Sequence, residues 1–309
     1  MAYTLSQMKE EGMECVAVGA RDLKRAKEFA SEYHIEKAYG SYEELVSDEE
    51  IDVIYIATPH SLHYEHTKLS LEHGRNVLCE KPITVNARQT RELIQLAKGK
   101  ELLLAEAMWT RFLPMRKVLD DLLGEYIIGE VKTVTANIGY CIDHVLRLQD
   151  PKLAGGALLD IGIYTLNFAA MVLGLDIKEI ESTCIKTDTG VDLQNMISLV
   201  YNNGTMAVLN STIATNTDLR GMIYGSKGYI EFVNINNCEK IIITLSDGKR
   251  NVIERPKQIT GFEYQVRAVC KALEAGKIEC IEMPHKDIIA IMELMDLLRS
   301  KWGISYPCE

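Results

Sequence analysis

The sequence has no long hydrophobic run and no excess of basic residues. No stretch reaches the roughly 18 consecutive apolar residues that a membrane-spanning helix needs, and the 309 residues carry a formal net charge of -10. We therefore expect neither a membrane protein nor a protein with a general nucleic-acid-binding surface. A local basic pocket for a phosphate group is still compatible with this charge.

Paired cysteines are also missing. The eight cysteines are scattered, and no two of them form a C-x-x-C pair, which argues against a structural zinc site and favours reduced, buried thiols. Residues 1–12, MAYTLSQMKEEG, lack the basic and apolar regions of a signal peptide. We expect a cytoplasmic protein without disulfides or a bound metal.

The composition is that of an ordinary globular protein with a large core, since 47% of the residues are hydrophobic and 25% are charged. Through residue 107, short apolar strands alternate with helical patterns. The strands are expected at 14–20, 51–58, 76–80 and 101–107, and the helices at 22–33, 61–74 and 86–100. This order predicts an α/β domain, residues 1–107, with a doubly wound parallel sheet of the Rossmann type.

The pattern changes in residues 108–309. A helix at 113–123, a strand at 129–140 and a helical segment at 155–174 precede a series of strands between 177 and 255. Asn203-Gly204 and Asp247-Gly248 are typical of tight hairpin turns, and helices at 260–275 and 285–302 close the chain. These residues predict an α+β domain with a mainly antiparallel sheet.

Polar residues follow several of the predicted parallel strands. Arg21, the segment 58–60, the segment 80–82 and the segment 106–111 each stand where a strand ends. Ligands of open parallel sheets bind at this edge. Because Pro82 disfavours a helical conformation of the residue before it, we expect Lys81 to lie in extended backbone and to face a cleft at this edge.

Four motifs, in this order, carry a resemblance to a known family: TPHSLH (58–63), CEKPIT (79–84), AEAMWTRFLP (105–114) and GGALLDIGIY (155–164). The chain resembles the Gfo/Idh/MocA family, the oxidoreductases related to glucose–fructose oxidoreductase and inositol dehydrogenase. The resemblance implies hydride transfer between NAD(P) and a carbinol or carbonyl group of a sugar, polyol or cyclic diol. It also implies a homodimer or homotetramer formed through the antiparallel sheet.

The same resemblance assigns the catalytic residues. Lys81 would polarise the substrate oxygen beside the nicotinamide, while Asp160 and Tyr164, four residues apart on one helix face, would point into the same cleft. Most of the family has histidine where this chain has Tyr164. This variant, together with MWTRF, resembles the branch that contains dimeric dihydrodiol dehydrogenases and NADP-dependent xylose dehydrogenases.

A phenol is a poor base at neutral pH, so we expect the Lys81 ammonium to favour the Tyr164 phenolate and make this residue a general acid and base. Alternatively, Tyr164 is a core aromatic residue with a satisfied hydroxyl group, and Asp160 is a helix residue bonded to backbone.

Further residues are assigned to the cofactor and substrate. The resemblance places Thr58, Pro59, His60, His63, Glu80, Lys81 and Trp109 at the cofactor, and Arg111 with Asp160 and Tyr164 at the substrate. The alternative for Trp109 and Arg111 is ordinary packing and an ion pair. Histidines at 60, 63 and 66 are also compatible with a metal cluster, but no companion cysteine accompanies them, and we expect no metal.

The end of the strand ECVAVGA bears on the choice of cofactor. A dinucleotide-binding fold that prefers NAD carries an acidic residue there for the ribose 2′-hydroxyl. Here Arg21 follows, and a guanidinium fits a 2′-phosphate. We expect NADP rather than NAD, with Arg21 as the main contact, Arg25 as a weaker one and Asp22 as a helix N-cap.

One element of the family pattern is not found. The family begins with a strand and a glycine-rich turn that binds the pyrophosphate, whereas this sequence starts with the helix-like segment 1–12. We therefore expect a sheet that lacks its first strand and glycine loop. This leaves two alternatives open: a non-catalytic or regulatory NAD(P)- or sugar-binding relative, or another reaction on the same scaffold, such as bilin or imine reduction or nicotinamide-dependent glycoside cleavage.

Overall fold

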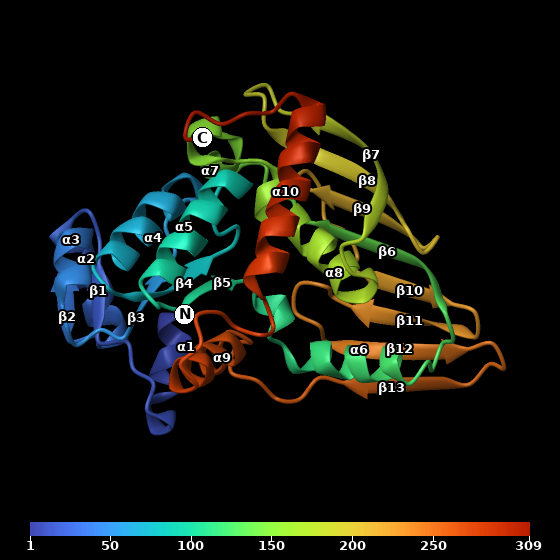
Figure 1. The fold of residues 1–309 in the computed structure, drawn as a ribbon, viewed down its shortest axis with the longest axis horizontal. Helices are drawn as coiled ribbons and strands as arrows, with labels where there is room; N and C mark the ends of the chain where they lie inside the picture. The colour runs from blue at the N-terminus through green and yellow to red at the C-terminus, as the bar shows by residue number, and fades with distance from the viewer.

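The computed structural model describes residues 1–309 and has two layers of different character (Figure 1). Parallel strands with helices packed against them form the N-terminal part, and one large sheet forms most of the remainder. A single hydrophobic cluster of 65 buried residues draws on both parts, so one continuous core joins them.

The N-terminal part alternates strands and helices. In chain order its elements are α1 (Ala2–Ser6), β1 (Ala17–Gly19), α2 (Leu23–Tyr33), β2 (Lys37–Tyr39), α3 (Tyr42–Ser47), β3 (Val53–Ile56), α4 (His63–Glu72), β4 (Asn76–Glu80), α5 (Ala87–Gly99) and β5 (Leu104–Ala107). Side-chain caps begin several of these helices: Asp22 accepts from the Lys24 amide, and Asn86 accepts from the Gln89 amide.

All ladders in this part are parallel. β1 pairs with β2, and β3, β4 and β5 form a second sheet in that order, without a ladder between β1 and β3. The predicted parallel α/β fold is thus confirmed. Segment 1–12, expected as a helix, is shorter in the structure, with α1 ending at Ser6 and a separate turn at Lys9–Glu11.

The C-terminal part contains an eight-stranded sheet with the order β13-β12-β11-β10-β6-β9-β8-β7. Its strands are β6 (Val131–Gly139), β7 (Ile177–Lys186), β8 (Asp192–Tyr201), β9 (Met206–Thr212), β10 (Gly221–Gly225), β11 (Gly228–Val233), β12 (Lys240–Leu245) and β13 (Arg250–Glu254). Only the central pair, β6 and β9, is parallel, so the prediction of a mainly antiparallel sheet is also confirmed.

Helices cover one face of this sheet (Figure 1). The helices of this part are α6 (Pro114–Gly124), α7 (Leu146–Gln149), α8 (Ile163–Leu173), α9 (Glu263–Glu274) and α10 (His285–Trp302). By length and composition alone, the helical stretch Pro151–Leu173 could cross a membrane, but 78% of its most apolar window is buried inside the protein. It is therefore explained as the central core helix, with α10 beside it.

Candidate active site at the ends of the parallel strands

Lys81 lies directly after β4, at the boundary between the two parts of the chain. Its ammonium Nζ donates to the main-chain oxygen of Asp160 at 2.5 Å and is 3.8 Å from the Asp160 carboxylate Oδ1. The same Nζ is 5.2 Å from the centre of the Tyr164 ring. Only 12% of the Lys81 side chain is exposed. These contacts bring together the three residues predicted to be catalytic.

Asp160 stands in an unusual turn. Residues Leu158–Gly162 form a π-helical turn that continues into α8, and such turns often occur at functional sites. Besides Lys81, Asp160 Oδ1 is 2.9 Å from Arg147 Nη1 and 3.6 Å from His60 Nε2. Burial alone would raise the pKa of Asp160, but the charges of Lys81, His60 and Arg147 outweigh it and lower the pKa below its usual value.

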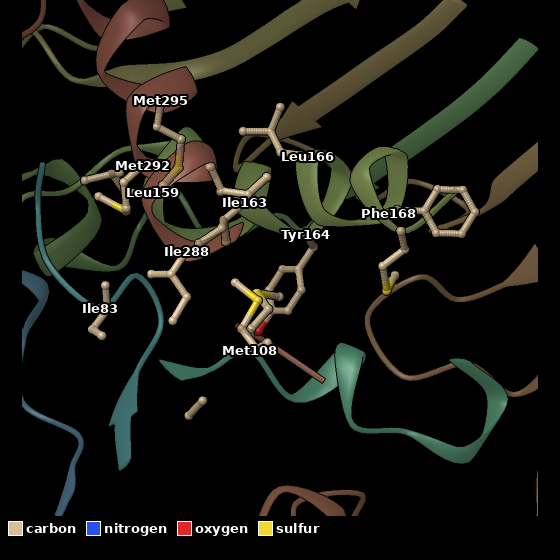
Figure 2. Close-up of a cluster of buried hydrophobic side chains, with 14 of the residues drawn as sticks. Ile83, Met108, Leu159, Ile163, Tyr164, Leu166, Phe168, Ile288, Met292 and Met295 are labelled. Atoms are coloured by element: carbon tan, nitrogen blue, oxygen red, sulfur yellow. The ribbon is translucent and has the colours of Figure 1, made fainter. Parts of the chain in front are cut away.

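Tyr164 is buried, and its ring lies beside Met108 at the end of the N-terminal part (Figure 2). Burial, followed by the carboxylates of Glu80 and Asp160, raises the pKa of Tyr164 well above its ordinary value. The expectation that Lys81 would favour the phenolate is therefore wrong. The ammonium lies over the aromatic ring, and the nearby carboxylates oppose ionisation, so the phenol of Tyr164 stays protonated.

The two predicted histidines are both buried and play different parts. His60 Nδ1 is 3.1 Å from the Ala154 carbonyl oxygen, and its other nitrogen faces Asp160. Burial, and then the charge of Lys81, lowers the pKa of His60. His63 Nδ1 is 2.7 Å from the Pro82 carbonyl oxygen, and His63 Nε2 is 2.8 Å from the Thr58 carbonyl oxygen. His63 thus holds the ends of β3 and β4 together.

The other residues predicted at the strand ends lie near His60 and His63. Pro59 starts the short turn His60–Leu62, and the Thr58 hydroxyl is 3.0 Å from His66 Nδ1. The Glu80 carboxylate accepts a hydrogen bond from the Tyr55 hydroxyl. No group of three or more histidine, cysteine or carboxylate side chains is arranged to hold a metal ion.

Trp109 and Arg111 follow β5, and the structure separates them. The Trp109 indole stacks on Phe262 and donates to Asn236 at 3.0 Å, close enough to the Tyr164 hydroxyl to lower its pKa slightly against the larger effect of burial. Trp109 therefore lies beside Tyr164.

Arg111 is instead committed to the protein interior. Its Nε donates to Asn167 at 2.7 Å and its Nη1 to Asp287 at 2.9 Å, while its Nη2 has no partner. With this side chain 5% exposed, the geometry supports the alternative reading, in which Arg111 ties α8 and α10 to the end of β5.

Two residues of the site were not predicted from the sequence. Arg147 reaches Asp160 from α7, the short helix between β6 and the π-helical turn, and no periodic pattern in the sequence marks it. Glu106 is buried at the end of β5, where it accepts the Ile83 amide at 2.9 Å; burial raises its pKa to about 7. Glu106 belongs to the polar segment 106–111 that the sequence marks at a strand end, but no role was predicted for this residue.

The donor groups at this edge fit a nicotinamide dinucleotide. Arg21 and Arg25 are exposed at the end of β1 and on α2, which suits a phosphate-bearing ribose. A basic outer end and a buried end with Lys81 and Tyr164 match a ligand that is anionic at one end and reactive at the other.

Comparisons with known proteins agree with this geometry. Residues 2–108 match the family model described as an oxidoreductase family with an NAD-binding Rossmann fold, and residues 117–231 match the GFO/IDH/MocA C-terminal domain. The chain is 36% identical over 310 residues to a trans-1,2-dihydrobenzene-1,2-diol dehydrogenase of Xenopus tropicalis, covering 98% of this chain and 94% of the relative. It is 35% identical over 299 residues to the Homo sapiens protein of that name, covering 94% and 90%.

Solved structures share the whole fold. A 3-ketoreductase from Actinomadura kijaniata, in complex with NADP and TDP-benzene, superposes with a TM-score of 0.87 at 25% identity, covering 97% of this chain and 92% of that one. An aldose-aldose oxidoreductase from Caulobacter crescentus is similar in fold, with a TM-score of 0.84 at 22% identity over 93% and 89% of the two chains.

Proposed function

The chain belongs to the Gfo/Idh/MocA family of oxidoreductases, and from this premise we propose that it transfers a hydride between NADP and the carbinol or carbonyl carbon of a cyclic diol or sugar. The observation that carries the proposal is the convergence of Lys81, Asp160 and Tyr164 in one buried spot. The relatives named as dihydrodiol dehydrogenases favour a cyclic vicinal diol as the first substrate to test.

In this proposal the bound nicotinamide gives or takes the hydride, and the protein manages charge and protons on the substrate oxygen. The Lys81 ammonium stabilises negative charge on that oxygen. Tyr164, kept neutral by burial, donates its phenolic proton in the reductive direction, and in the oxidative direction the small fraction of Tyr164 in the phenolate form accepts the proton of the substrate hydroxyl. Asp160 holds Lys81 in place through its main-chain oxygen and its carboxylate.

The test is a binding titration followed by a substrate screen. NADPH fluorescence is titrated with the protein, and trans-dihydrodiols, pentoses and hexoses are then screened with NADP⁺ for reduction of the cofactor. Binding of NADPH and turnover of at least one diol or sugar are expected. Binding without any turnover would favour a regulatory relative, and absence of binding would contradict the proposal.

The preference for NADP rests on Arg21. Replacing Arg21 with alanine is expected to raise the Kd of NADPH by roughly 10- to 100-fold, because a charge-assisted hydrogen bond to the 2′-phosphate is lost. The Kd of NADH, which lacks this phosphate, should stay within about twofold. Lys27→Ala, a second exposed cation on α2, is the control. Equal losses for both cofactors would remove Arg21 from the phosphate site.

We also propose that the uncovered face of the large sheet forms a homodimer interface. This face exposes Met196, Val208, Tyr224 and Tyr229 on four strands, and clustered apolar residues on a sheet are typical of an interface. The double variant Met196→Lys/Val208→Lys should convert a dimer into a monomer in light scattering after size exclusion.

The control for this experiment is Ile281→Lys, which changes a still more exposed apolar residue between α9 and α10. It should leave the dimer intact. A wild-type protein that is already monomeric at micromolar concentration would refute the proposed interface.

A further inference from the structure

A row of buried polar side chains lies beneath the π-helical turn. Asp192 and Asn195 come from β8, and Ser211 comes from β9. Asp192 Oδ2 accepts from Asn195 Nδ2 at 2.9 Å, and Asn195 Oδ1 accepts from the Ser211 hydroxyl at 2.9 Å. All three side chains are buried. None of them contacts Lys81 or Tyr164, and the proposed chemistry does not use them.

Two glycines of the motif GGALLDIG, Gly156 and Gly162, lie directly on this row. A methyl group added at Gly156 would come within 2.3 Å of Asp192 Oδ1, and one added at Gly162 would come within 2.8 Å of the Ser211 hydroxyl. Gly156 also has a φ of +108°, which other residues rarely adopt. The lack of a side chain at these two glycines therefore allows the turn to pack against the polar row.

Asp192 makes the direct connection to the turn. Its Oδ2 accepts from the Leu158 amide at 2.7 Å, and Leu158 is the first residue of the π-helical turn. Two residues further on, the main-chain oxygen of Asp160 receives the Lys81 ammonium. The Asp192 carboxylate thus fixes the backbone that in turn holds the catalytic amine.

We propose that Asp192 is a positioning residue, which sets the turn 156–162 so that the Asp160 carbonyl and the Tyr164 ring keep Lys81 in its reactive place. This inference rests on the proposed function. Asp192 acts through the backbone, and its carboxylate accepts the Leu158 amide more strongly than a neutral amide oxygen would.

The Asp192 carboxylate is fully buried, an environment that disfavours its charged form. Burial raises its pKa to about 6, against the opposing effects of the Leu158 amide, Asn195 and the Arg299 guanidinium of α10. The other titratable groups that face it are Tyr306 and Cys184. Since a raised carboxyl pKa means that the charged form costs stability, this cost is fully present above about pH 6 and is lost progressively as the pH falls from about 6 to about 4, the pKa of an unfolded carboxyl.

The substitution Asp192→Asn separates two roles. If Asp192 only stabilised the fold, the melting temperature would fall; if it positions the turn, turnover should fall without that loss of stability. The amide keeps the shape but removes the buried charge, so the melting temperature at pH 7.5 should be equal or higher. kcat should nevertheless fall about tenfold, while the NADPH Kd stays within about twofold. The wild-type kcat should also decline as the pH falls through about 6, and this decline should be absent in the variant.

Hydrogen exchange supplies a readout that does not depend on turnover. At one fixed pH, peptides that cover residues 156–164 should exchange faster in Asp192→Asn than in the wild type, with other peptides unchanged. Asp188→Asn, an exposed aspartate before β8, is the matched control and should change nothing.

The outcomes separate this inference from the proposed function. Unchanged exchange in 156–164, or a global increase together with a lower melting temperature, would overturn the positioning role. A wild-type protein that turns over no diol or sugar would refute the proposed function, while the exchange result would still decide whether Asp192 holds the turn.

Discussion

Replacing Lys81 with alanine is expected to lower kcat by about 10³-fold, the largest loss that we predict for a single substitution. A group that stabilises charge on the reacting oxygen inside a buried site contributes a factor of roughly 10² to 10³. Lys81 is such a group, since its ammonium is nearly buried and is held by the Asp160 main chain. Turnover by the wild type and the variant at saturating substrate measures the loss.

A structural role for Lys81 would give a different result. Removal of the ammonium leaves the Asp160 carboxylate with Arg147 and His60 as neighbours, so the pocket keeps positive charge and the fold should survive. We expect a melting temperature within a few degrees of the wild type and NADPH binding that weakens by less than tenfold. Lys117→Ala, which removes an exposed amine on α6, should leave kcat unchanged. A Lys81 variant with more than a tenth of wild-type turnover would contradict the catalytic assignment.

The strands and the edge of the sheet were predictable because local sequence determines them. Apolar β-branched runs such as 53–56 can be buried on both faces, and short connections force parallel strands to end at the same edge. Lys81 and Tyr164 are far apart in sequence, but each follows from a motif whose placement needs only the fold. The resemblance assigned the roles of Lys81, Asp160 and Tyr164, and the fold made their meeting at one place predictable without coordinates.

The protonation state of Tyr164 was not accessible, because it depends on tertiary burial and on which atoms face the ammonium. The sequence places a cation near the phenol, but only the structure places it over the ring and brings Glu80 and Asp160 close.

A sequence signal did exist for the buried polar row of Asp192, Asn195 and Ser211. Asn195 and Ser211 are in phase with the inward residues Ile197 and Leu209 of their strands, and polar residues in core positions indicate a specific partner.

Replacing Tyr164 with phenylalanine is expected to lower kcat by roughly 10²- to 10³-fold in both directions, because a positioned proton donor contributes a factor of this order. The substitution removes only the hydroxyl group. The aromatic ring, with the Lys81 ammonium 5.2 Å from its centre, remains, so the melting temperature and the NADPH Kd should stay close to the wild type. Tyr201→Phe is the control, since it removes a buried hydroxyl that has no hydrogen-bond partner and should not slow turnover.

The pH dependence follows from the direction of the pKa shift. Since burial raises the pKa of Tyr164 well above its ordinary value, the phenol stays protonated throughout the working range, and reduction should not decline between pH 7 and about 9. Oxidation needs a proton acceptor, which the neutral phenol is not, so its kcat should rise with pH over the same range. Parallel measurements of both directions test this asymmetry. A reductive rate that falls through pH 8, and does so only while Tyr164 is present, would mean that the phenol ionises near neutrality and that Lys81 lies closer to the hydroxyl than to the ring.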